Sequence, residues 1–251
     1  MNLIDRLTHM EKVPEGMSPA ETYQCRIEDT VCYLKKIDEV FSPTTYSVQR
    51  EADVMLWLTD KLNVPAMMEC GRVSGKEYLI MSEVKGRHID DFVESPLLYV
   101  TNLAKALKQL WSIDTSACRF SSRLDVRLQE LDYLLKNGLA DVNPAHWQNT
   151  TTFTEPAELY AWLCSHKPPE EELVFSHGDL GANFLVADDE IIYFDLARCG
   201  IADKWQDIAL CVRDIREYGL GSSHEEAFFQ MLGVEPNQQK LDYYVLLDEM
   251  F

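Results

Sequence analysis

Short runs of β-branched and aromatic residues in the first third of the chain predict a small β-sheet. Two of these runs are separated by the mainly polar residues 26–29 and therefore predict a hairpin. Two later runs are separated by Gly75 and Lys76, which predict a turn between them, and glycine and proline predict another turn over residues 15–20. The predicted strands are residues 22–25, 30–36, 66–70 and 78–83.

The spacing of apolar positions changes to a helical period between residues 45 and 62. Apolar side chains recur there every three or four positions, and Thr45 is typical of the residue that caps the start of a helix. We expect the helix to end before Val64, because a residue followed by proline is disfavoured in helical conformation. The apolar face consists of Val48, Ala52, Met55, Leu58 and Leu62.

Helical periodicity dominates the chain after Gly86, so we expect an α+β fold of two unequal lobes. The amino-terminal lobe, residues 1–84, carries a small antiparallel sheet, and the larger, mainly helical lobe spans residues 85–251, with a hinge at about residues 82–86. Asn137 and Gly138 are typical of a left-handed helix end. The predicted helices are residues 97–113, 124–136, 156–164, 203–217, 224–232 and 237–251, and residues 143–154 form a loop.

Within the helical part, residues 174–198 gather the densest group of candidate catalytic side chains. Loops that connect strands commonly carry catalytic residues, and the strand-like runs here are residues 173–175, 184–186 and 191–194. The polar side chains between them are His177, Asp179, Asn183 and Asp195.

Composition and charge narrow the classes of function. The chain has no apolar run long enough to span a membrane and no signal-peptide pattern at its amino terminus, so we expect a cytoplasmic protein. Seven scattered cysteines without a Cys-x-x-Cys pair argue against a disulfide framework or a zinc site and indicate reduced, mostly buried thiols. A formal charge of −19 argues against nucleic acid and anionic membranes as partners. The acidic excess either attracts a small cationic partner or keeps the protein soluble. We also expect the protein to be a monomer or a weak dimer.

The central polar residues match the requirements of phosphoryl transfer. That reaction needs a carboxylate at the acceptor hydroxyl, a metal held by oxygen ligands and a cation on the donor phosphates. Asp179 can accept the hydroxyl proton, and Asn183 and Asp195 can bind Mg²⁺. Lys35 at the end of a predicted strand and Glu51 on the predicted helix can supply the cation and its partner. A metallohydrolase would use His177 with the aspartates, but such sites normally contain more histidines.

Longer motifs extend from one end of the chain to the other. They include T-T-Y-S-V-Q-R-E from Thr44, E-E-L-V-F-S-H-G-D-L-G from Glu171, A-D-K-W-Q-D-I-A from Ala202 and Y-Y-V-L-L-D-E-M-F from Tyr243. With these motifs the sequence resembles the bacterial aminoglycoside 3′-phosphotransferases, resistance enzymes with a two-lobed protein-kinase-like fold. The resemblance covers nearly the whole chain.

The resemblance implies a role for each matching residue. Asp179 would be the catalytic base, Asn183 and Asp195 the magnesium ligands, and Lys35 with Glu51 the pair that holds the phosphates of ATP or GTP. The remaining nucleotide contacts would come from the loop residues Met17 and Ser18, from Tyr33 stacked on the base, and from the backbone of Ser82 and Val84. A cationic aminoglycoside such as kanamycin or neomycin would lie near Arg198, Arg213, Glu217, Asp248, Glu249 and Phe251.

The sequence departs from that family around the catalytic aspartate. Asn183 is the fourth residue after Asp179, whereas family members have the asparagine at the fifth. The interval from Asp179 to Asp195 is also two residues shorter than in close relatives, and Ala182 stands where they carry an acidic residue. The loop at residues 143–150 is neutral where kanamycin-modifying relatives are acidic. Two alternatives therefore stay open: a kinase for another small hydroxylated metabolite, and a catalytically impaired nucleotide- or drug-binding relative.

Overall fold

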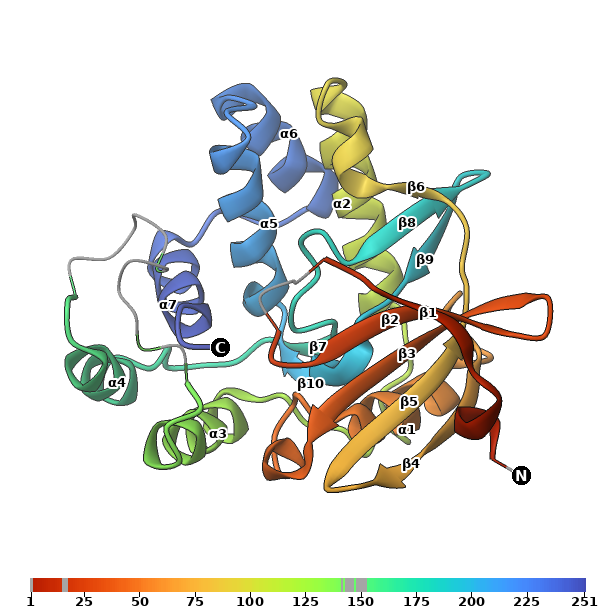
Figure 1. Cartoon of the computed structure of the whole chain (residues 1–251). Helices are drawn as coiled ribbons and strands as arrows, with labels where there is room; N and C mark the ends of the chain where they lie inside the picture. The colour runs from red at the N-terminus through yellow and green to blue at the C-terminus, as the bar shows by residue number, and fades with distance from the viewer. Residues whose placement is uncertain (1, 15–17, 141, 143–146, 148–152) are drawn as a thin grey trace. The chain divides into compact units, whose positions relative to one another are not determined.

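The computed structural model describes residues 2–14, 18–140, 142, 147 and 153–251. It confirms the α+β class, with antiparallel strands and seven α-helices in the described part of the chain (Figure 1). The chain divides into two compact units, and each is described by itself. The first unit comprises residues 1–87 and 183–198, and the second comprises residues 88–182 and 199–251.

An antiparallel sheet of five strands forms most of the first unit, in the order β1-β2-β3-β5-β4 (Figure 1). The four predicted strands are confirmed, including the hairpin of β2 and β3. The strand β1 was not predicted, because all of its side chains are exposed and show no alternation. The strands are β1 (Thr8–Lys12), β2 (Glu21–Ile27), β3 (Thr30–Asp38), β4 (Met67–Val73) and β5 (Lys76–Ser82).

The two faces of this sheet have different partners, because successive side chains of a strand point to opposite sides. On one face, Cys32 and Leu34 of β3 belong to a buried cluster against which Leu3 and Leu7, at the ends of the short 3₁₀ segment η1 (Leu3–Arg6), are packed. Lys35 therefore points to the opposite face. That face is covered by the helix α1 (Val48–Leu58), which contacts β3, β4 and β5.

The start of α1 is held by a buried carboxylate. The helix cap is Ser47, not Thr45 as predicted, and the Ser47 hydroxyl accepts from the backbone N–H of Arg50 at 3.2 Å. The same hydroxyl donates to Glu77 of β5 at 2.7 Å, and Glu77 is 1% exposed. Ser47 therefore binds both the helix and the sheet. Local composition favoured Thr45, two residues earlier, because the partner Glu77 is distant in sequence.

Residues 183–198 pack with the amino-terminal part of the chain. They form the hairpin of β8 (Phe184–Ala187) and β9 (Glu190–Tyr193), followed by the 3₁₀ turn η4 (Leu196–Arg198). Tyr193 donates its backbone N–H to the Asn63 carbonyl at 2.9 Å. A Cβ added to Gly86 would lie 2.9 Å from Leu185, so this approach requires glycine. The two domains proposed from the sequence, residues 1–84 and 85–251, are each continuous along the chain. The units of the structure are defined by which segments pack together, so neither of them is continuous.

Helices form most of the second unit and agree with the predicted ones to within a few residues. Gly138 has the left-handed φ of 66° expected after the second predicted helix. The largest difference is α7, which ends at Asp248 rather than at residue 251. The helices are α2 (Pro96–Trp111), α3 (Leu124–Lys136), α4 (Pro156–Ser165), α5 (Trp205–Glu217), α6 (Ser222–Leu232) and α7 (Gln238–Asp248), preceded by the 3₁₀ turn η3 (Ile89–Phe92).

Two short antiparallel strands complete this unit. The predicted β7 (Leu173–Ser176) pairs with β10 (Gly200–Asp203), which was not predicted because its four residues show no apolar alternation. The short β6 (Arg87–His88) lies at the boundary of the units. All seven cysteines are free, and four of them are buried. None of the described helices combines the length and the apolar character that a membrane crossing requires. Residues 15–17 of the expected turn and most of the expected loop 143–154 lie outside the described residues.

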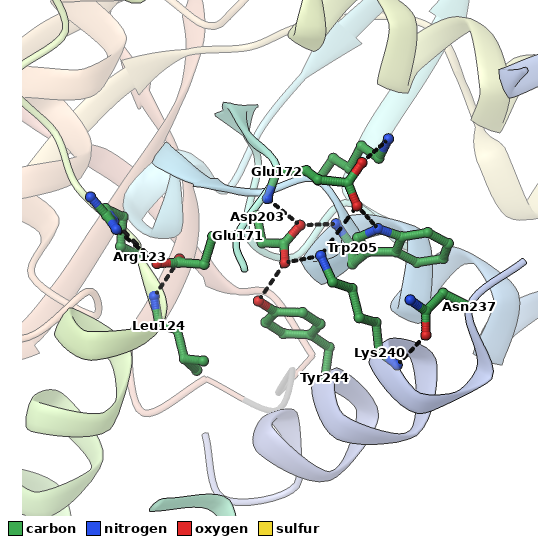
Figure 2. A network of polar contacts seen from close by, with 10 residues as sticks. Arg123, Leu124, Glu171, Glu172, Asp203, Trp205, Asn237, Lys240 and Tyr244 are labelled. Carbon is green, nitrogen blue, oxygen red and sulfur yellow. Dashed lines mark hydrogen bonds and ion pairs between the residues drawn. The ribbon is translucent and has the colours of Figure 1, made fainter. Parts of the chain in front are cut away.

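An ionic network centred on the buried Asp203 anchors α7 to β10 (Figure 2). Lys240 of α7 donates to Asp203 of β10 at 2.9 Å and to Glu172 at 3.2 Å. The Tyr244 hydroxyl, one turn further along α7, donates to Asp203 at 3.0 Å, and the Trp205 indole donates to Glu172 at 2.7 Å (Figure 2). Because these groups sit at the start of α5 and on α7, the network sets the position of both helices.

Replacing Lys240 by Met should lower the free energy of unfolding by about 3 kcal/mol, since removing one partner of a buried ion pair leaves the other uncompensated. Urea unfolding measures the effect. Lys136→Met is the matched control, because its pair with Asp132 is exposed and should contribute less than about 1 kcal/mol. Equal effects of the two substitutions would contradict the anchoring role of Lys240.

Candidate active site

Lys35 lies at the centre of a three-residue ionic cluster in the first unit. Its ammonium group is 2.9 Å from a carboxylate oxygen of Glu51 and 2.6 Å from one of Asp195. Lys35 is 9% exposed and Glu51 is 1% exposed, so both charges are largely removed from water. The contact arises because β3 presents Lys35 to α1 and the first turns of α1 present Glu51 to the sheet.

The cluster keeps the lysine cationic. Burial by itself lowers the pKa of Lys35, but the charges of Asp195 and Glu51 outweigh it and raise that pKa above its usual value. A buried ammonium group held between carboxylates is a fixed positive charge, of the kind that binds the phosphates of a nucleotide.

Four consecutive residues after β9 are each bound to another part of the first unit. Asp195 binds Lys35, and the Leu196 backbone N–H donates to Glu51 at 3.1 Å. The Ala197 carbonyl accepts from the Arg50 side chain at 2.7 Å, and Arg198 donates to the Tyr46 hydroxyl at 3.3 Å. Asp195 itself has a left-handed φ of 56°, a conformation that costs energy for a residue with a side chain. These contacts maintain that conformation.

Asn183 and Asp195 flank the open end of the β8–β9 hairpin. The Phe194 backbone N–H donates to the Asn183 carbonyl at 3.2 Å, which continues the register of the hairpin by one pair. An amide and a carboxylate oxygen fit Mg²⁺, which takes one or two protein ligands and completes its shell with water and phosphate. The described residues contain no group of three or more histidines, cysteines and acidic residues arranged for a metal. Asn183 and Asp195 thus carry oxygen atoms of the type that Mg²⁺ prefers, at the open end of one hairpin.

The other residues predicted to contact the nucleotide lie on or near the same sheet, except for Met17, which is outside the described residues. Tyr33 is two positions before Lys35 on β3, so both lie on the face that α1 covers. Ser82 ends β5 and donates its backbone N–H to the Ala66 carbonyl at 2.9 Å. Val84 follows β5, and the Ser18 hydroxyl accepts from the Ala20 N–H at 3.2 Å just before β2.

Asp179 lies in a loop of the second unit that is built around another buried carboxylate, that of Asp207. Asp207, near the start of α5, accepts from the Ser176 hydroxyl at 2.7 Å. It also accepts backbone N–H groups from His177 at 2.8 Å, Gly178 at 2.9 Å and Leu180 at 3.3 Å. The loop on both sides of Asp179 is therefore fixed by one side chain that is not exposed at all.

Asp207 was not singled out from the sequence, although it belongs to the quoted motif A-D-K-W-Q-D-I-A. In the sequence alone, Asp207 has the pattern of a solvent-exposed residue on a helix of mixed polarity. Its helical neighbours Cys211 and Ile208 are buried, which was the available signal that this side of α5 faces inward. His177 is fully buried as well, which agrees with a packing or orienting role.

The residues predicted to contact the substrate are divided between the units. Arg198 lies in the first unit, against Tyr46. In the second unit, Arg213 binds Asp248 at 2.9 Å, and Arg213 and Glu217 line a cavity of about 120 Å³ between α5 and α7. Glu249 and Phe251 follow α7, and the Phe251 ring stacks 3.6 Å from the guanidinium carbon of the buried Arg127. Asp248, Glu249 and Phe251 thus come from one segment whose helix is anchored by Lys240.

A buried lysine–glutamate pair that joins a strand to a helix is typical of kinase-like phosphotransferases. The model of the phosphotransferase enzyme family matches residues 9–244. An aminoglycoside 3′-phosphotransferase of Campylobacter jejuni is 56% identical over 251 residues, which cover 100% of both chains. The chain belongs to the aminoglycoside 3′-phosphotransferase family and is a phosphotransferase with an alcohol group as acceptor.

Solved structures agree with the fold. A type VIII aminoglycoside 3′-phosphotransferase is similar with a TM-score of 0.82 and 24% identity, covering 98% of this chain and 96% of that one. An aminoglycoside phosphotransferase of Streptomyces rimosus, solved with ADP and streptomycin, has a TM-score of 0.79 and 22% identity, covering 96% and 91%. The predicted kinase-like fold is confirmed.

Replacing Asp207 by Asn should disturb the loop around Asp179, because an amide can accept fewer of the four hydrogen bonds and places donors against donors. We expect a loss of about 2 to 3 kcal/mol in the free energy of unfolding. We also expect kcat to fall about a hundredfold from a small displacement of Asp179. Asp125→Asn, an exposed carboxylate in the first turn of α3, is the control. An Asp207→Asn enzyme with unchanged kcat would contradict the positioning role.

Proposed function

We propose that this protein transfers the γ-phosphoryl group of ATP or GTP to a hydroxyl group of an aminoglycoside such as kanamycin or neomycin, and thereby confers resistance to it. The observation that carries the proposal is the buried Lys35–Glu51–Asp195 cluster in a chain of this family. The relative solved with ADP and streptomycin is consistent with a nucleotide donor and an aminoglycoside acceptor.

The nucleotide half of the reaction is assigned to the first unit. Lys35 would bind the α- and β-phosphates while Glu51 keeps its side chain in place. The base would stack on Tyr33, and Ser82 would contact its edge through the carbonyl, since the Ser82 N–H is already bound to Ala66. The backbone N–H of Val84 is the second proposed contact, and Met17 and Ser18 would lie over the phosphates.

Magnesium would be held by Asn183 and Asp195. An ion held there would supply positive charge that offsets the charge of the donor phosphates. The shorter interval between Asp179 and Asn183 is compatible with this role, because the backbone bond from Phe194 fixes Asn183 next to the segment that carries Asp195.

The acceptor half of the reaction is assigned mainly to the second unit. Asp179 would accept the proton of the attacking hydroxyl, since its loop is rigid and its side chain is only partly buried. Asp248 and Glu249, with Glu217, would attract the ammonium groups of the substrate. The formal charge of −19 supports the same preference for a polycation. Phe251, Arg213 and, in the first unit, Arg198 complete the proposed set.

Asp179→Asn should abolish turnover and leave nucleotide affinity nearly unchanged, because the amide cannot accept the proton. Mass spectrometry of products from a panel of aminoglycosides, other antibiotics and sugars, each with ATP and Mg²⁺, measures the activity of the wild type and the variant. A phosphorylated sugar with no phosphorylated aminoglycoside would replace the proposed substrate class. Wild-type turnover in Asp179→Asn would remove Asp179 as the base.

Lys35→Met should raise the KM for ATP and lower kcat, whereas Lys36→Met should change neither. Lys36 is the matched control because it points to the opposite face of β3, 4.6 Å from the Tyr23 ring centroid. The variant Lys35→Met also leaves Glu51 buried without its cation, so it should be destabilised. The double variant with Glu51→Gln should recover stability in thermal unfolding without recovering activity. Recovery of both would mean that Lys35 acts only in folding.

A further inference from the structure

Asp214 is a largely buried carboxylate beside the loop of Asp179, and it has no part in the function proposed above. It lies seven residues after Asp207 on α5, so both carboxylates lie on the same side of the helix. Asp207 holds the loop from residue 176 to 180, and Asp214 lies at the next residue, Gly181. A Cβ added to Gly181 would be 2.8 Å from an oxygen of Asp214, so a side chain at this position would displace the carboxylate.

The second oxygen of Asp214 faces an arginine that is already engaged elsewhere. Arg213 donates through Nε to Asp214 at 3.3 Å and through Nη1 to Asp248 at 2.9 Å. The side chains of Arg213, Asp214 and Asp248 are only 18%, 13% and 18% exposed. One largely buried cation is therefore shared by two carboxylates from different helices.

This sharing matters because Asp248 is assigned to an ammonium group of the substrate. An ammonium group that binds Asp248 must compete with Arg213 for the same carboxylate. If Asp248 were the sole partner of Arg213, its release would leave a buried cation uncompensated, which costs several kcal/mol. Asp214 prevents that situation, since it stays bound to Arg213 through the other side of the guanidinium group.

We propose that Asp214 is a positioning residue for substrate binding, which retains Arg213 when an ammonium group of the aminoglycoside takes Asp248. The inference rests on the proposed function, in which Asp248 binds the substrate. It assigns Arg213 two positions of similar energy, one shared between both carboxylates and one held by Asp214 alone.

The raised pKa of Asp214 indicates that its negative charge costs folding stability. This favours a role in binding over a role in stabilising the fold. Burial raises the pKa of Asp214 to about 7, Arg213 opposes the shift, and Glu217 and Asp179 reinforce it. Tyr99 of α2, with Tyr218 and Cys211, also experiences its charge. Because the folded-state pKa lies above the value of 3.8 for an exposed aspartate, stability is lost as pH rises from about 4 through 7. A carboxylate retained at such a cost is typical of functional sites.

Replacing Asp214 by Asn tests the inference with two readouts. Calorimetry should find kanamycin bound about tenfold more weakly, equivalent to about 1.4 kcal/mol, with unchanged affinity for ATP. Thermal unfolding at pH 8 should find the variant at least as stable as the wild type, because a buried charge is removed. A purely structural carboxylate would give the opposite pair of results, lower stability and unchanged kanamycin affinity, and would overturn the inference.

Two further variants separate the mechanism from a general loss of negative charge. Glu226→Gln removes an exposed carboxylate from α6 and should leave kanamycin affinity unchanged. In an Asp248→Asn background, Asp214→Asn should have little additional effect, since the competition for Arg213 no longer exists. An equal effect of Glu226→Gln, or a full effect of Asp214→Asn in the Asp248→Asn background, would overturn the inference. If the wild-type protein does not bind kanamycin, both the proposed substrate and this inference are overturned.

Discussion

The first unit depends on the neutralisation of one buried carboxylate, that of Glu51. A carboxylate that is 1% exposed is tolerated only if cations and N–H groups surround it, and Lys35 and the Leu196 N–H do so. Those two partners come from the sheet and from the segment after β9. The electrostatic requirement of a single side chain therefore joins a strand, a helix and the segment after β9, which are far apart in sequence.

The second unit applies the same principle twice, at Asp207 and at Asp203. Asp207 accepts hydrogen bonds from the backbone of the loop around Asp179, and Asp203 accepts hydrogen bonds from Lys240 and Tyr244 of α7. Each buried acid orders a segment that has little apolar surface of its own. Loops that carry polar catalytic groups cannot be held by hydrophobic packing, because their side chains must stay accessible. Buried carboxylates on the neighbouring elements provide the alternative.

Much of the fold could be predicted because the spacing of apolar residues along the chain indicates which side chains are buried. The hairpin of β2 and β3 and the face of α1 follow directly from it. The pair of Lys35 and Glu51 was predicted instead from the need of phosphoryl transfer for a cation on the donor phosphates. The carboxylates Asp207 and Asp214 could not be found this way, since a polar residue on an amphipathic helix looks solvated unless its partners are known. Their partners are backbone N–H groups, a glycine and an arginine, which leave no distinctive pattern. The strand β1 was not predicted for a related reason, because an exposed strand shows no alternation of apolar and polar residues.

The four consecutive contacts made by residues 195–198 have a consequence for inhibitor design. A ligand of this site could bind either the ordered arrangement of residues 195–198 or a second conformation in which that segment is displaced. Here such a displacement would break the bonds to Lys35, Glu51, Arg50 and Tyr46 together, at a cost that a small molecule would have to recover from new contacts. Compounds that match the ordered arrangement, with Asp195 kept beside Lys35, are the better starting point.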